Sequence, residues 1–161
     1  MNQYRFTQEE SPKPEDVYFL IHNLVAFNTT RVGSENYHPL TIFLRDANDR
    51  IVGGINAYTI WEWLFISHLW IDDALRGAGF GQQLVAAAEA EAVRRGCLHA
   101  LLDTFSFQAR GFYEKLGYEV FGVLDEFPKG HSRYYLQKRD LNRAAESLAA
   151  TASAVEAVRT V

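Results

Sequence analysis

Apolar residues near the start of the chain recur at the spacing of a helix. Residues 15–27, EDVYFLIHNLVAF, carry apolar side chains three or four positions apart, at Val17, Leu20, Ile21, Leu24 and Val25. Acidic residues open this stretch, where the positive end of a helix dipole favours negative charge, so the pattern predicts a helix. A short apolar alternation before it, at residues 4–6, predicts an opening strand.

The next stretch of the chain changes to the spacing of strands. Residues 41–44 and 51–60 are rich in apolar and β-branched residues, and the turn-forming residues 46–49 between them predict a hairpin. The run WLFISHLWI at residues 63–71 is apolar at almost every position. Such a run predicts a central strand that is buried on both faces.

The second half of the chain alternates helices with strands. Residues 81–96, GQQLVAAAEAEAVRRG, predict a helix that ends at Gly96, with one apolar face formed by Leu84, Val85, Ala88 and Ala92. A shorter helix is predicted at residues 107–117, and strands are predicted at residues 97–104, 118–124 and 132–138. This order of elements predicts an α/β fold with a mixed sheet and one strand–loop–helix–strand crossover.

Length and composition limit the classes of protein that the chain can belong to. Its 161 residues, with ordinary apolar and charged fractions, predict one globular domain at residues 1–140 and an alanine-rich tail at residues 141–161. In the tail, apolar residues recur seven apart, at Leu141, Leu148 and Val155. The tail either frays or packs on a partner subunit or on its own domain, and we expect a homodimer.

Charge, cysteines and hydropathy exclude several partners. The net charge of −4 offers no basic surface to nucleic acid or to an anionic membrane. Cys97 is the only cysteine and the histidines lack metal-ligand spacing, so we expect neither an internal disulfide nor a metal. No signal region opens the chain, and no apolar run approaches the roughly 18 residues of a membrane span. We therefore expect a cytoplasmic protein.

A glycine-rich segment lies between a predicted strand and a predicted helix. In LWIDDALRGAGFGQQL, residues 69–84, Arg76 is followed by Gly77, Gly79 and Gly81. Bare backbone at a helix N-terminus, where the first N–H groups lack partners, binds anions, and an arginine adds a charge-assisted donor. The segment predicts a diphosphate site, and a tight turn without a ligand is the alternative.

Two common phosphate-binding motifs do not match these residues. The dinucleotide motif G-x-G-x-x-G, counted from Gly77, requires a third glycine where the chain has Gln82. The P-loop requires Gly-Lys-Ser/Thr, and the segment contains no lysine. We therefore do not expect NAD(P) or ATP to be the ligand.

The segment resembles a different family. The pattern Arg76-x-x-Gly79-x-Gly81 after an apolar strand is similar to the R/Q-x-x-G-x-G/A pyrophosphate loop of the GNAT superfamily of N-acetyltransferases. FYEKLGY, residues 112–118, resembles that family's second motif, a short helix with a tyrosine that ends at glycine before a strand. The resemblance spans residues 4–140. It implies a mostly antiparallel twisted sheet with a splayed central strand pair, flanked by helices.

The resemblance also implies a reaction and a cosubstrate. An acetyl group passes directly from acetyl-CoA to a primary amine of a small molecule or peptide. The loop and the end of the preceding strand would hold CoA through Leu69, Trp70, Ile71, Arg76, Gly77, Ala78, Gly79, Phe80, Gly81 and Gln82. Ser106 stands where the family commonly has an asparagine that bonds the pantetheine, so we expect it to bind the cosubstrate too.

Tyr113 stands where the family places the acid that protonates the departing thiolate. A phenol with a pKa of about 10 stays protonated at neutral pH, and a thiol has a pKa of about 8.5. The alternative is a ring that only packs in the core. We interpret Tyr113 as the acid because Phe112 and Leu116 can supply the packing.

The base and the acceptor site are less well defined by the sequence. In the family the base often lies on the strand before the loop, where this chain has Ser67 and Phe65. His68 has a suitable pKa range, but strand alternation puts it on the other face unless a bulge intervenes. A packed histidine and a water relay past Ser67 are the alternatives. We expect Asn28, Ser67 and His68 to contact the acceptor.

Two other classes of function fit the same residues. A non-catalytic acyl-CoA-binding or sensor domain would use the glycine loop without a base. An interaction module would use the tail, with the fold as its scaffold. Tyr113 favours the enzyme over both.

Overall fold

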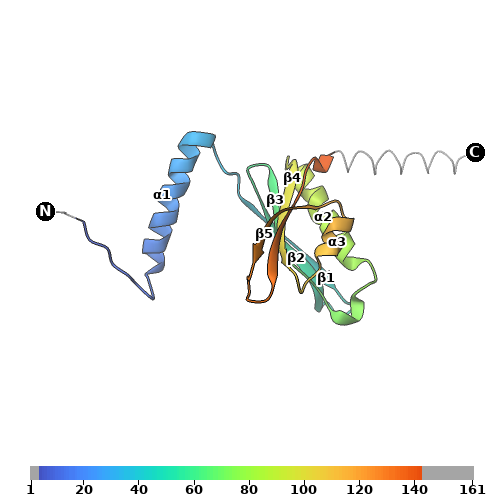
Figure 1. Cartoon of the computed structure of the whole chain (residues 1–161). Helices are drawn as coiled ribbons and strands as arrows, with labels where there is room; N and C mark the ends of the chain where they lie inside the picture. The colour runs from blue at the N-terminus through green and yellow to red at the C-terminus, as the bar shows by residue number, and fades with distance from the viewer. Residues whose placement is uncertain (1–3, 143–161) are drawn as a thin grey trace, which may run out of the picture. The chain divides into compact units, whose positions relative to one another are not determined.

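The structure is a computed structural model that describes residues 4–142 (Figure 1). Its internal contacts divide the chain into two units, Met1–Glu35 and Asn36–Val161. Within the part of the chain that the structure describes, no helix combines the length and the apolar character of a membrane span. Most of the predicted tail, from residue 143 onward, lies outside the described residues.

The first unit contains the predicted helix α1, Pro14–Val32. Pro14 starts it with a fixed φ, and Gly33, with φ of 80°, ends it by donating its N–H to the carbonyl of Thr29. None of the residues of α1 is buried.

The predicted opening strand at residues 4–6 is wrong. Residues 4–13 have no regular structure, and Tyr4 and Phe6 are exposed. A strand needs a partner for its backbone N–H and C=O groups, and the described strand pairings give this segment none. Three alternating residues are too short a pattern to establish such a pairing.

The second unit is a six-stranded sheet in the order β1-β2-β3-β4-β6-β5. Neighbours are antiparallel except for β3 and β4, which are parallel and joined through the helix α2. The strands are β1 (His38–Arg45), β2 (Ile51–Ile60), β3 (Trp63–Ile71), β4 (His99–Phe105), β5 (Glu119–Asp125) and β6 (Ser132–Lys138). The predicted α/β class with a mixed, mostly antiparallel sheet is confirmed.

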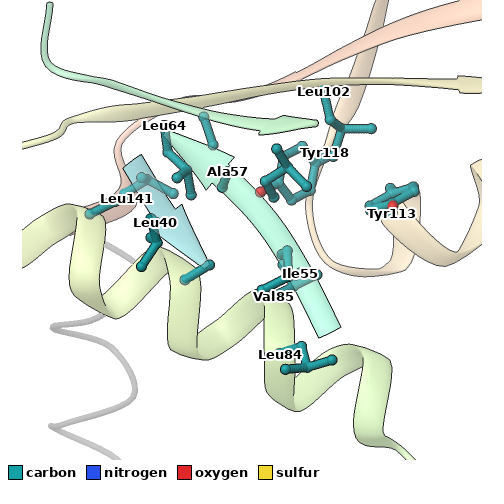
Figure 2. Packing of buried hydrophobic residues seen from close by; sticks show 14 of the residues in the cluster. Leu40, Ile55, Ala57, Leu64, Leu84, Val85, Leu102, Tyr113, Tyr118 and Leu141 are labelled. Carbon is teal, nitrogen blue, oxygen red and sulfur yellow. The ribbon is translucent and has the colours of Figure 1, made fainter. Parts of the chain in front are cut away.

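Two helices, α2 (Phe80–Arg94) and α3 (Arg110–Lys115), lie next to one another on one side of the sheet (Figure 1). A short 3₁₀ turn, η1 (Asp73–Leu75), precedes α2. The buried residues of α2 are the four that the apolar pattern predicts, Leu84, Val85, Ala88 and Ala92. Figure 2 shows Val85 against Ile55 of β2, so this face of α2 forms the core with the sheet.

The start of the predicted tail belongs to this core. Leu141 is 2% exposed, and its N–H donates to the carbonyl of Leu98, which follows α2. The first apolar residue of the heptad pattern therefore packs on its own domain. Leu148 and Val155 lie outside the described residues.

Candidate active site

A bulge in β3 sets which side chains face the site. Asn56 of β2 lies opposite His68, but the next residue, Ala57, lies opposite Ile66, so Ser67 is an extra residue in β3. Before the bulge, Ile66 is buried on the side of α2, and after it, Leu69 packs against the same core. Counted back from Ile71 and Leu69, His68 lies on the opposite face together with Asn56, as strand alternation predicts, so the bulge does not turn it inward.

The central parallel pair separates at one end. β3 pairs with β4 from Trp63 opposite His99 to Ile66 opposite Leu102, and no further pairing of the two strands follows. Both strands nevertheless continue, β3 to Ile71 and β4 to Phe105. The ends of β3 and β4 are thus not paired with one another. This is the splayed strand pair that the resemblance implies.

A cavity of about 900 Å³ lies at this opening. Ser67, His68 and Tyr113 line this cavity. Most of the residues that the sequence predicts to bind the cosubstrate line it too, namely Leu69, Trp70, Ile71, Arg76, Gly77, Gly79, Phe80, Gly81 and Gln82. Ala78 and Ser106 do not line it. Asn28 lies on α1, in the first unit, and its predicted contact with the acceptor stays a prediction.

Glycine is required at the three loop positions for two different structural reasons. Gly77 and Gly79 have φ of 80° and 85°, a left-handed conformation that favours glycine. Apart from Gly77 itself and its two chain neighbours, no described residue has an atom within 4 Å of a Cβ built at Gly77. Gly81 lies in the first turn of α2, where a Cβ would be 3.3 Å from Cζ of Phe112. The first two glycines shape an open loop, and the third lets α2 and α3 pack closely.

The N-terminus of α2 is open toward the cavity. Gly79 is the N-cap and supplies no side-chain hydrogen bond, and the N–H groups of Phe80 and Gly81 have no acceptor among the described residues. The guanidinium of Arg76 pairs with Asp73, and its Nε donates to the carbonyl of Ile71 over 3.2 Å. Unpartnered N–H groups, the helix dipole and a neighbouring arginine are the donors that a diphosphate requires.

Tyr113 of α3 has a ring that packs in the core and a hydroxyl that is free to act as an acid, so it fits both alternatives that the sequence leaves open. Its ring is buried and packs edge-on against Phe112 and Tyr118, with centroids 5.0 and 6.0 Å away. Its hydroxyl has no hydrogen-bond partner among the described residues, yet it is not sealed from solvent. Burial, and then the charge of Asp103, raise the pKa of Tyr113 to about 12, so the phenol keeps its proton at neutral pH.

Sequence reasoning missed three polar residues that line the cavity, Asp103, Thr104 and Gln108. Both oxygens of Asp103 accept from Arg133 of β6 over 2.7 Å. The side-chain oxygen of Gln108 accepts from the hydroxyl of Thr104 over 3.1 Å and from the N–H of Phe105 over 3.0 Å. A carboxylate inside the apolar run of β4 was the signal that could have identified Asp103.

Ser106 has other partners. Its hydroxyl lies 3.1 Å from Nδ1 of His131 and accepts from the N–H of Ser132 over 3.3 Å. These bonds join the loop after β4 to the turn between β5 and β6. The predicted contact between Ser106 and the pantetheine stays a prediction.

Comparison with known proteins decides the family. The model of the acetyltransferase (GNAT) family matches residues 3–118. The chain belongs to the GNAT family of acetyltransferases. It is 36% identical to acetyltransferase Atu2258 of Agrobacterium fabrum over 116 residues, which cover 72% of this chain and 85% of that relative.

Two further comparisons agree with this family. The chain is 38% identical to the blasticidin-S acetyltransferase of Streptomyces morookaense over 104 residues, which cover 62% of this chain and 76% of the relative. A crystal structure from Agrobacterium tumefaciens has a TM-score of 0.79 and 32% identity, and the match covers 84% of this chain and 99% of that one. This GNAT member is an acetyl-CoA-dependent N-acetyltransferase.

Proposed function

We propose that the protein transfers an acetyl group from acetyl-CoA to a primary amine of a small molecule, with Tyr113 as the general acid. One observation carries this proposal. The cavity extends from the open N-terminus of α2 to the splayed ends of β3 and β4, and Tyr113 lines it. A diphosphate, an extended pantetheine arm and a reacting thioester need these three features in one continuous space.

Each part of the cosubstrate has a partner in this space. The diphosphate binds the N–H groups of Phe80 and Gly81, and Arg76 turns from Asp73 toward the phosphate oxygens. The pantetheine lies along the end of β3, where Leu69 and Ile71 have no neighbouring strand on the side of β4. This arm bonds to the strand in the way that a peptide adds to an open sheet edge.

The reaction requires four proton movements to agree. The acceptor ammonium loses one proton to water and attacks the thioester carbonyl as a neutral amine. The C–S bond breaks as the sulfur takes the proton of Tyr113, the second nitrogen proton leaves through water, and Tyr113 regains a proton from solvent. A pKa of about 12 keeps Tyr113 protonated until the sulfur leaves. Ser67 and His68 line the cavity and support a water chain for the first of these steps.

The acceptor is a small molecule in this proposal. A relative at 38% identity is named as an acetyltransferase of blasticidin S, which supports a small-molecule amine over a peptide. The homodimer and the cytoplasmic location stay predictions.

A thiol-release assay tests the proposal. Purified protein is mixed with acetyl-CoA and a panel of polyamines, aminoglycosides, amino acids, blasticidin S and peptide N-termini, and free CoA is followed with a thiol-reactive chromophore. We expect turnover with at least one small amine. Tight binding of acetyl-CoA without turnover on any amine would instead support a non-catalytic acyl-CoA-binding domain.

A further inference from the structure

Two fully charged side chains line the cavity, and they have opposite signs. Arg76 lies in the glycine loop before α2, and Asp103 lies on β4 just beyond the point where β4 separates from β3. Among the described lining residues, Arg76 is the only lysine or arginine and Asp103 the only carboxylate. The loop therefore suits an anion, and the region around Asp103 suits a cation.

Asp103 belongs to the face of the sheet away from α2. Its neighbours Leu102 and Thr104 are buried, and the strand alternation puts Asp103 on the other face. His68 lies opposite Asn56 of β2, on that same face. Asp103 and His68 therefore flank the opening from β4 and β3, opposite to the side on which Tyr113 packs.

The carboxylate of Asp103 keeps hydrogen-bonding capacity. Arg133 donates one bond to each oxygen, whereas a carboxylate offers about four acceptor directions. No other described donor bonds to Asp103, and its side chain is 32% exposed. A ligand can therefore bind to the carboxylate while the ion pair stays intact.

Arg133 is held so that it does not compete for a ligand. Its guanidinium lies between 5.4 and 5.6 Å from three ring centroids, those of Phe105, Phe127 and Tyr135. It does not line the cavity. The rings and the two-point contact fix Arg133, and Arg133 in turn fixes Asp103.

We infer that Asp103 binds the acceptor amine in its ammonium form, that Arg133 positions Asp103, and that the acceptor is therefore a cationic amine. The inference rests on the proposed function, because it names the acceptor site of that reaction. The opposite charges that line one cavity separate the anionic cosubstrate from the cationic acceptor. The bound ammonium then lies beside the thioester, on the face opposite to Tyr113, and loses a proton to the water chain before it attacks.

Steady-state kinetics of Asp103→Asn test this inference, with the best amine of the panel. Loss of a charge-assisted contact should raise the KM for the amine by about 10- to 100-fold, with the KM for acetyl-CoA changed by less than about threefold. Glu89→Gln is the matched control, because it breaks another ion pair of β6, with Lys138, away from the cavity. Arg133→Gln keeps the carboxylate but loosens it, so we expect a lower kcat with a smaller rise in KM.

The wild-type protein provides a second test that does not depend on the folding of a variant. Butyltrimethylammonium cannot be acetylated, and it should inhibit competitively against the amine, whereas neutral butanol should not. Turnover by the wild type with an unchanged amine KM in Asp103→Asn, or equal inhibition by the two probes, would overturn the inference and leave the proposed function intact. Absence of turnover would refute the proposed function, and calorimetry of butyltrimethylammonium with the CoA-bound wild type and Asp103→Asn would then show whether Asp103 binds a cation.

Discussion

Two buried tyrosines, Tyr113 and Tyr118, differ in the hydrogen bonding of their hydroxyls. The hydroxyl of Tyr118 donates to Glu89 over 2.9 Å, and Lys138 donates to the other oxygen of Glu89 over 2.8 Å. Tyr113 also lies near a carboxylate that is paired with an arginine, but its own hydroxyl has no partner among the described residues. Both rings are drawn together in the core in Figure 2.

The comparison of the two tyrosines shows that a raised pKa alone does not indicate a catalytic role. Burial raises the pKa of both phenols, with further contributions from Asp103 at Tyr113 and from Glu89 at Tyr118. Only Tyr113 lines the cavity. An unused hydrogen bond that faces a ligand space, rather than the size of the shift, therefore identifies the candidate acid.

The largest expected effect is on the acetyl-transfer step. Tyr113→Phe keeps the ring and removes the acid, so the rate of that step should fall by about 10²- to 10⁴-fold. Tyr118→Phe should leave the rate within a few-fold, because its hydroxyl is bonded to Glu89. Single-turnover kinetics at saturating acetyl-CoA measure both variants. Equal rates in the two variants would return Tyr113 to a packing role.

A smaller effect is expected on stability, and here Tyr118→Phe rather than Tyr113→Phe should have the larger one. Tyr118→Phe removes a buried hydrogen bond to a carboxylate and should lower the free energy of unfolding by about 1–3 kcal/mol. Tyr113→Phe loses no internal hydrogen bond among the described residues, so its free energy of unfolding should stay within about 0.5 kcal/mol of the parent. Urea unfolding at pH 7 compares the two, and a larger loss in Tyr113→Phe would mean that its hydroxyl has a hidden partner.

The smallest expected effect occurs at alkaline pH. The pKa of Tyr113 is raised to about 12 in the folded protein, so its contribution to stability is complete below the unfolded value near 10 and is lost as pH rises toward 12. At pH 11 the wild type should have lost about 1.4 kcal/mol more than Tyr113→Phe, relative to pH 8. Urea unfolding at the two pH values measures this difference, and parallel losses would place the phenol in a more solvated site.

Local patterns predicted most of the fold. The spacing of apolar residues predicted the bounds of β2, β3 and β6 and the buried face of α2, because these depend on neighbouring residues in the chain. The opening strand failed because a strand depends on a distant partner. Residues of the glycine loop and Tyr113, whose motifs are local, line the cavity, and their roles stay predictions.

The proposed acceptor side of the cavity could not be predicted in the same way. The bulge at Ser67 changes the face of Ile66 and the residues before it while His68 stays opposite to Leu69, and it depends on the register between β2 and β3. Asp103 and Arg133 are thirty residues apart in the chain and meet only because β6 lies beside β4. Such long-range pairings are invisible to a pattern of neighbouring residues.

Calorimetric titration with CoA tests most directly the claim that α2 and its loop hold the diphosphate. Gly79→Val adds a β-branched side chain at φ of 85° before α2, and Gly96→Val makes the same change at φ of 86° after it. Both glycine variants should lower the free energy of unfolding, but of the two only Gly79→Val should weaken CoA binding, by about tenfold or more. Arg76 is exposed, and Arg76→Ala should weaken CoA binding by about 10- to 100-fold. Parental affinity for CoA in both Gly79→Val and Arg76→Ala would contradict the account, because the loop would then be only a turn.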